Sequence, residues 1–212
     1  MRRFTSPLFL AALSLLLFIP SRLAADLIWT PESGWHVEGG VLAGMGGEDG
    51  RNALDLMNRA RTAEEADQEK AALSLYAKVG KKYPNSVFAS EALYHIGVIR
   101  QKRRQYYKAF DAYQQMLARY PNSEKFNQVI GEQYRIASDL FEGKRPRIWG
   151  VIPGFRNREK ALEYFETIVR TAPYSDYAPL SLINASKGYK QIGESEAAID
   201  ALDRMINTYP RN

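Results

Sequence analysis

The chain has 212 residues, a formal net charge of +5, two histidines and no cysteine. This length suits one core or a short array of repeats, so we expect one folded domain. Without cysteine there is no disulfide, thiolate nucleophile or cysteine metal site. Two histidines, His36 and His95, supply too few groups to suggest a catalytic triad or a zinc site. We therefore expect a protein that is not an enzyme and that uses no metal, cofactor or small-molecule substrate.

The first 25 residues have the pattern of a secretory signal peptide. Two arginines precede an apolar run from Leu8 to Ile19, and the small residues Ala24 and Ala25 follow. The run is shorter than the roughly 20 residues of a spanning helix, although an uncleaved N-terminal anchor is the alternative. Residues 1–25 carry three arginines and no acid, so their removal lowers the net charge from +5 to +2. We expect an exported protein, in the periplasm or beyond, with no nucleic-acid partner.

Residues 26–50 are interpreted as an irregular arm and linker. Trp29 and Trp35 lie on either side of a proline and a glycine, and we expect the arm to pack either onto the folded domain or onto a partner. The glycine-rich stretch 44–50 has no predicted strand before it and no Gly-Lys-Ser/Thr after it. It is therefore a flexible linker rather than a phosphate-binding loop.

A proline-containing sequence recurs four times in the rest of the chain: KYPNS at 82–86, RYPNS at 119–123, TAPYS at 171–175 and TYPRN at 208–212. The first two prolines are 37 residues apart, and so are the last two. The middle interval is 52 residues, which equals 37 plus an insertion of 15. Because proline cannot continue a helix, each copy predicts a helix end, with asparagine and serine available to cap the next helix.

The residues before each proline repeat as well. Alanine stands 12 residues before every proline, a bulky residue stands eight before, and an apolar residue stands five before. These positions are Ala72, Ala109, Ala161 and Ala198; Tyr76, Tyr113, Phe165 and Leu202; and Val79, Met116, Ile168 and Met205. Steps of four and three residues place each set on one face of a helix.

This spacing resembles the tetratricopeptide repeat (TPR), a helix–turn–helix unit with small residues where its helices cross and a proline after the second helix. The resemblance implies an all-α, TPR-like solenoid of about four repeats over 51–212. It also implies a right-handed superhelix with the first helices along a concave groove. The units should end near 86, 123, 175 and 212. The helix pairs should span 51–62 and 65–82, 87–103 and 105–119, 125–141 and 157–171, and 177–192 and 195–208. An unrelated helical bundle is the alternative.

The insertion, at about residues 142–156, separates the two helices of the third pair. With the repeat length and the Tyr-Pro-Asn-Ser endings, it resembles the periplasmic family of the outer-membrane assembly lipoprotein BamD, where a loop interrupts the same pair. Two features depart from that family. Asp26 stands where a lipidated cysteine is expected, which puts lipid anchoring in doubt, and the chain has four units rather than five.

The resemblance implies a non-enzymatic periplasmic scaffold, associated with the outer membrane, that acts in the assembly of β-barrel proteins. Its implied partners are the outer-membrane insertase barrel and unfolded outer-membrane proteins. Tyr94, Arg100 and Gln101 are the predicted groove residues, although Tyr94 could instead pack within the array. Two other functions stay open: a CpoB-like coordinator of Tol-Pal and cell-wall synthesis, and a TPR accessory protein of a secreted enzyme.

Two segments rich in basic and aromatic residues are further candidates for partner contacts. The turn within the second pair contains Arg103 and Arg104, close to Tyr106, Tyr107 and Lys108. The insertion places Lys144, Arg145 and Arg147 beside Trp149, Ile152 and Phe155. Both segments could attract an acidic partner or an anionic membrane surface, and a solvated helix end is the alternative reading of the first.

Overall fold

The computed structural model describes residues 26–38 and 47–210. The chain divides into two units, Met1–Arg51 and Asn52–Asn212, which are considered separately. The predicted signal peptide at 1–25 lies outside the described residues. In the described part of the chain, no helix is long and apolar enough to cross a membrane.

The N-terminal unit contains a β-hairpin where we predicted an irregular arm. Strands β1 (Asp26–Thr30) and β2 (Gly34–Glu38) pair antiparallel, and Trp29 lies opposite Trp35. Thr30 and Ser33 close the turn through their hydroxyls, 2.6 Å apart, and Gly34 has a φ of +68°. The prediction of an irregular arm was wrong because it gave too little weight to the turn residues between two short runs of β-formers.

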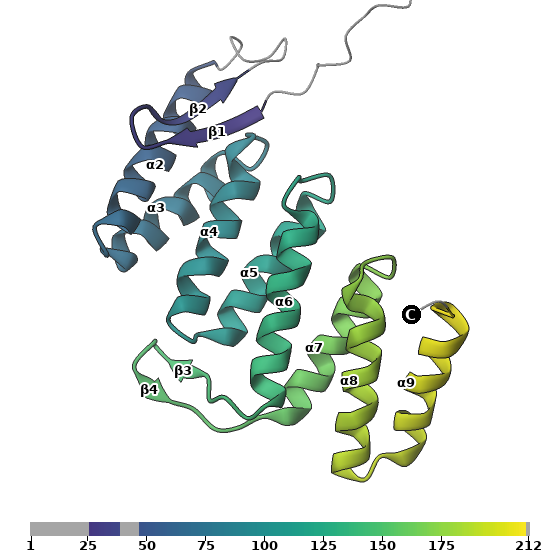
Figure 1. The fold of residues 1–212 in the computed structure, drawn as a ribbon. Helices are drawn as coiled ribbons and strands as arrows, with labels where there is room; N and C mark the ends of the chain where they lie inside the picture. Colours follow the sequence, from purple (N-terminus) through teal and green to yellow (C-terminus); the bar gives the residue numbers. More distant parts are fainter. Residues whose placement is uncertain (1–25, 39–46, 211–212) are drawn as a thin grey trace, which may run out of the picture. The chain divides into compact units, whose positions relative to one another are not determined.

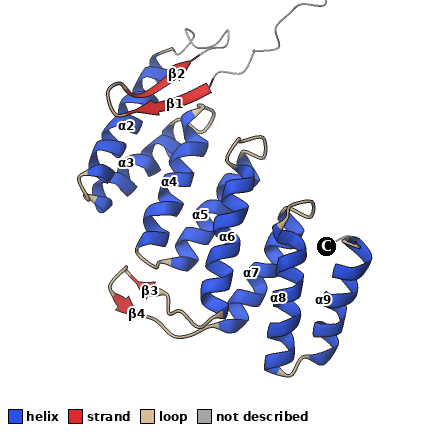
Figure 2. Cartoon of the chain, viewed as in Figure 1, coloured by secondary structure: helices blue, strands red, loops and turns tan. Residues whose placement is uncertain are grey.

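The second unit is a stack of helical hairpins. Successive helices from α3 to α9 contact one another and lie side by side in Figure 1, and Figure 2 shows that helices dominate the unit. The helices are α2 (Glu48–Glu65), α3 (Glu69–Lys82), α4 (Phe88–Lys102), α5 (Tyr106–Arg119), α6 (Phe126–Phe141), α7 (Arg158–Thr171), α8 (Tyr177–Ile192) and α9 (Ser195–Thr208). These bounds confirm the predicted pairs and the TPR-like solenoid. One difference is that α2 begins at Glu48, inside the segment predicted to be a linker.

The repeated positions form the core of the array. The alanines 12 residues before each proline are all buried, and so are Tyr76, Tyr113 and Phe165 eight residues before the first three prolines. The small residue Gly97 is needed for this packing, because a Cβ at that position would lie 2.2 Å from Cε1 of Tyr113. Leu202, the fourth bulky residue, is 40% exposed, since no further helix covers α9 among the described residues.

The proline-containing sequence ends one helix and ties neighbouring repeats together. The Tyr120 hydroxyl donates a hydrogen bond to the carbonyl of Pro84 at 2.6 Å, and Tyr209 donates to Pro173 at 2.6 Å. Ser86 and Ser175 do not cap the following helices as we predicted, whereas the Ser123 hydroxyl accepts a hydrogen bond from the amide of Lys125 at 3.4 Å, directly before α6. The hydroxyls of Ser86 and Ser175 instead donate back to the carbonyls three residues earlier, at 2.8 and 2.9 Å, which closes a turn around each proline.

Each helical hairpin turns through one residue of left-handed backbone. These residues are Asp67, Arg104, Gly143 and Gly193, with φ between +55° and +87°. The left-handed conformation ends a helix and redirects the chain. The insertion therefore begins directly after the turning residue of the third pair, and α6 keeps a normal helix end before it.

Candidate functional site

The insertion folds into a small hairpin of its own. Strands β3 (Arg147–Ile148) and β4 (Ile152–Pro153) pair antiparallel. Trp149 and Gly150 both have positive φ, 52° and 81°, and the amide of Val151 donates to the carbonyl of Ile148 at 3.2 Å. Two positive φ values in succession give a turn whose twist suits a tight hairpin.

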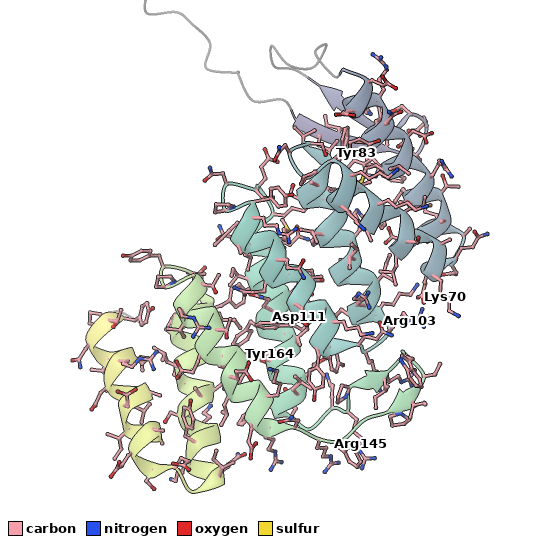
Figure 3. The ribbon with its side chains drawn as sticks, turned by 180° about the vertical axis from the view of Figure 1, so that it is seen from behind. Lys70, Tyr83, Arg103, Asp111, Arg145 and Tyr164 are labelled. Atoms are coloured by element: carbon pink, nitrogen blue, oxygen red, sulfur yellow. The ribbon has the colours of Figure 1, made fainter. Side chains whose placement is uncertain are left out.

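This hairpin is attached to the turn of the second pair by hydrogen bonds. The amide of Arg147 donates to the carbonyl of Arg104 at 2.7 Å, and Arg103 Nη2 donates to the carbonyl of Trp149 at 3.1 Å. Arg103 is held in turn by Glu69, 2.9 Å from its Nη1. Gly150 lies so close that a Cβ there would be 2.5 Å from Arg103 Nε. Figure 3 shows Arg103 next to the hairpin and Arg145 at the outer edge of the loop.

The attached hairpin and the start of α5 enclose a pocket of about 440 Å³, which we call the loop pocket. Its apolar wall consists of aromatic and aliphatic side chains, and its cations are Lys108, Arg147 and Arg156. The complete lining is Gln105, Tyr106, Tyr107, Lys108, Pro146, Arg147, Ile148, Trp149, Gly154, Phe155, Arg156 and Asn157. The lining contains no acidic residue. The two candidate segments, predicted separately, thus form one site.

One wall of the loop pocket is fixed from behind. Tyr106 is buried, and its hydroxyl donates to Asp139 Oδ2 at 2.9 Å. Burial and this hydrogen bond to a carboxylate raise the pKa of Tyr106 to about 12. Asp139 also accepts a hydrogen bond from Lys144 Nζ at 2.6 Å. The neutral tyrosine therefore holds the start of α5 against α6 at any physiological pH.

The three predicted residues of the insertion take different positions. Trp149 and Phe155 line the loop pocket and remain 69% and 91% exposed, whereas Ile152 lies on β4 outside it, 48% exposed. Arg103 and Arg104 hold the hairpin in place instead of lining the pocket. Arg156 is a lining residue that our sequence analysis missed. Its position next to Phe155 could have suggested a role, but only the fold brings it close to Lys108.

The predicted groove residues do not gather on one surface. The Tyr94 hydroxyl accepts a hydrogen bond from Gln128 Nε2 at 2.7 Å. Gln101 donates to Glu132 at 2.8 Å and accepts from Tyr113 at 2.9 Å. Both side chains therefore link first helices of adjacent repeats. Arg100 points elsewhere on α4, where it donates to Gln105 at 3.2 Å. Their role in peptide binding stays a prediction, as does that of Trp29 and Trp35 on the N-terminal hairpin.

A buried polar cluster surrounds His95, which our sequence analysis had set aside. His95 Nδ1 lies 2.9 Å from Glu64 Oε2, and Nε2 lies 3.3 Å from Glu91 Oε1. Tyr76 stacks on the imidazole at 5.0 Å between ring centroids and donates to Glu64 at 2.7 Å. Burial lowers the pKa of His95, but the two carboxylates outweigh it, so the net direction is upward. The sequence contained one indication of this cluster: Glu91 and His95 are four residues apart on a predicted helix, so their side chains are expected to be neighbours.

The His95 cluster is structural in its geometry. Its members lie on α2, α3 and α4, and every polar contact named above joins two groups of the array to each other. In the ranges 26–38 and 47–210, no group of three or more histidine, aspartate or glutamate side chains is placed to hold a metal ion.

Comparison with known proteins supports the repeat assignment. The tetratricopeptide repeat family matches residues 56–86 and 91–123, which cover most of α2–α3 and of α4–α5 and end with the first two proline-containing sequences. A search of curated protein sequences gives no match. Two of the four helical pairs therefore match the tetratricopeptide repeat family, and they lie within a TPR-like solenoid. Repeats of this class commonly mediate protein–protein interactions, and TPR proteins are generally non-enzymatic scaffolds.

Proposed function

We propose that this chain is an exported, non-enzymatic adaptor in the assembly of β-barrel proteins into the outer membrane. It would act in the periplasm, docked on the insertase barrel, and would hold unfolded outer-membrane proteins. The pattern of a signal peptide in residues 1–25 supports the location. The repeat length and the site of the insertion, which resemble the BamD family, support the pathway.

One observation carries this proposal: the insertion of the third pair is a folded and attached element with an open pocket. A connection that served only to join two helices would need a few residues. Here the chain forms a hairpin, attaches it to the second pair through Arg103 and Arg104, and leaves Trp149 and Phe155 largely exposed. Exposed aromatic side chains beside cations are typical of protein interaction sites.

Co-purification tests this function. The full chain, with an affinity tag after Asn212, would be isolated from detergent-solubilised envelopes of its native cells, and the recovered proteins identified by mass spectrometry. We expect the insertase barrel to be enriched over an untagged control. Recovery of Tol-Pal components without the insertase would contradict the proposal and favour the CpoB-like role. A chain that stays in the cytoplasm would contradict the proposed location.

A further inference from the structure

We propose that the loop pocket binds an acidic, apolar peptide segment of a partner protein, with an apolar side chain inside and carboxylates at the rim. This inference rests on the proposed adaptor function and specifies the chemistry of its ligand. It follows from the charge, the shape and the rigidity of the pocket.

The charge of the pocket calls for an anionic ligand. Lys108, Arg147 and Arg156 come from three separate segments, and none of them pairs with a carboxylate among the described residues, whereas the neighbouring Arg103 and Lys144 do. A partner carboxylate at the rim would complete the missing ion pairs. Hydrogen bonds between charged groups are roughly twice as strong as neutral ones.

The shape of the pocket favours a peptide over a membrane surface. Tyr107, Ile148, Trp149 and Phe155 give it an apolar wall, and its volume of about 440 Å³ falls in the range of small-ligand sites. Side chains that project from an extended peptide can enter a concavity of this size. A flat lipid headgroup layer would instead contact the protruding rim.

The pocket is organised before any ligand arrives. Arg103 fixes the backbone of Trp149, the carbonyl of Arg104 fixes Arg147, and Asp139 fixes Tyr106. A site whose walls are already held loses little conformational entropy on binding. The hairpin therefore supplies affinity that a free loop of the same composition would not.

Fluorescence anisotropy with labelled peptides tests this inference on the full mature chain. Two probes alternate acidic and apolar residues, Glu-Phe-Asp-Leu-Glu and Asp-Trp-Glu-Ile-Asp, and a control probe, Lys-Phe-Lys-Leu-Lys, reverses the charge. We expect both acidic probes to bind and the basic one to bind at least about tenfold more weakly. Higher salt should weaken the acidic probes several-fold, because the rim cations are exposed.

Matched variants locate the binding. Combining Lys108→Glu with Arg156→Glu should weaken the acidic probes by about tenfold or more, with the melting temperature unchanged. Arg145→Glu carries the same kind of charge reversal in the same loop but does not line the pocket. It should change binding by less than about twofold, since exposed charges at a distance are screened.

Several results would overturn the inference. The first is that neither acidic probe binds. The second is that the Lys108→Glu/Arg156→Glu double variant binds the acidic probes as tightly as the unchanged chain. The third is that Arg145→Glu weakens binding as much as the double variant does. Sedimentation with phosphatidylglycerol vesicles separates the membrane alternative: vesicle binding that needs Lys108 and Arg156, without peptide binding, would assign the pocket to lipid. If the acidic peptides do not bind but the insertase still co-purifies, the result contradicts only the proposed ligand of the loop pocket. If the peptides bind but the insertase does not co-purify, the result contradicts only the proposed role in outer-membrane protein assembly.

Discussion

Single tyrosine hydroxyls connect neighbouring repeats in this array. Tyr120 and Tyr209 stand directly before the prolines and reach back about one full repeat, to the carbonyls of Pro84 and Pro173. Tyr83 holds the same place in the first repeat, where no helical pair comes earlier among the described residues. The recurring tyrosine therefore has a structural role that the spacing alone does not reveal.

We predict that Tyr120→Phe lowers the free energy of unfolding by about 1 kcal/mol, the usual net contribution of one hydrogen bond. The matched change Tyr83→Phe should lower it by less than half as much. Urea denaturation followed by circular dichroism measures both. Equal losses in the two variants would mean that the bond to Pro84 contributes nothing specific.

The left-handed turns allow a second prediction at single residues. Gly193 has a φ of +87°, and a Cβ there would meet nothing within 4 Å. Gly193→Ala should therefore cost about 1–2 kcal/mol through backbone strain alone. Gly80 also has open space for a Cβ but lies inside α3, so Gly80→Ala should raise stability by about 0.5–1 kcal/mol. Thermal melts that move the same way for both variants would contradict this reading of the turn.

At the scale of elements, the His95 cluster joins α2, α3 and α4 through groups that titrate. Glu64, Tyr76, Glu91 and Tyr94 face the imidazole, and Lys125 lies 3.5 Å from Glu91. Burial raises the pKa of Glu64, but the hydrogen bonds from His95 and Tyr76 and the charge of His95 outweigh it, so its net shift is downward. The cluster is therefore most favourable with His95 protonated and Glu64 ionised.

The signs of these shifts give a pH dependence. Because the folded pKa of His95 is raised, its stabilisation is complete below its unfolded pKa of about 6.5 and is lost as the pH rises through the folded value. The contribution of Glu64 is present above its own unfolded pKa and is lost as the pH falls through its lowered folded value. We predict a lower free energy of unfolding at about pH 9 than at about pH 6.

The variant His95→Gln isolates this effect. It keeps a polar side chain but cannot titrate, and it should cost about 1–3 kcal/mol at about pH 6, where Glu64 and Glu91 lose the charged partner that protonated His95 provides. Its stability should change less than that of the wild type between about pH 6 and pH 9. Parallel pH profiles for the two proteins would show that another group is responsible.

The helices of this chain were predictable from sequence, and the attachment of the insertion was not. The fixed intervals between alanines, bulky residues and prolines indicate where each helix contacts its neighbours. The helix pairs from α2 to α9 could therefore be predicted from these intervals. Hairpin β1–β2 depends on the short turn between Thr30 and Gly34. We did not predict this turn, because we interpreted the segment that contains Trp29 and Trp35 as irregular. The loop pocket depends on two hydrogen bonds between segments more than 40 residues apart, from Arg103 to the Trp149 carbonyl and from the Arg147 amide to the Arg104 carbonyl. No periodicity encodes such a contact.

The predicted groove also shows a limit of sequence reasoning. Tyr94, Arg100 and Gln101 are close in sequence, but the helix places Arg100 on a different side of α4 from Tyr94 and Gln101, and those two side chains are hydrogen-bonded to α6. Trp149 and Phe155, predicted as partner contacts, do lie together at the loop pocket and are largely exposed, and their contact with a partner stays a prediction.

At the scale of the whole molecule, the array supplies the support and the insertion supplies most of the loop pocket. Side chains of the four first helices link one to the next, from Glu64–His95 through Tyr94–Gln128 to Tyr134–Asn184. A loop attached to such a stack presents its aromatic residues in a fixed place. This division of roles fits a protein that holds a partner.

Photo-crosslinking in living cells tests this account most directly. Phe155, 91% exposed at the loop pocket, would be replaced by p-benzoylphenylalanine, and Tyr174, a 99% exposed aromatic residue in the third proline-containing turn, would be replaced in the matched control. We predict that position 155 crosslinks to the insertase barrel or to an unfolded outer-membrane protein, and that position 174 does so far less. Equal labelling from both positions, or no labelling of either partner from position 155, would contradict the account.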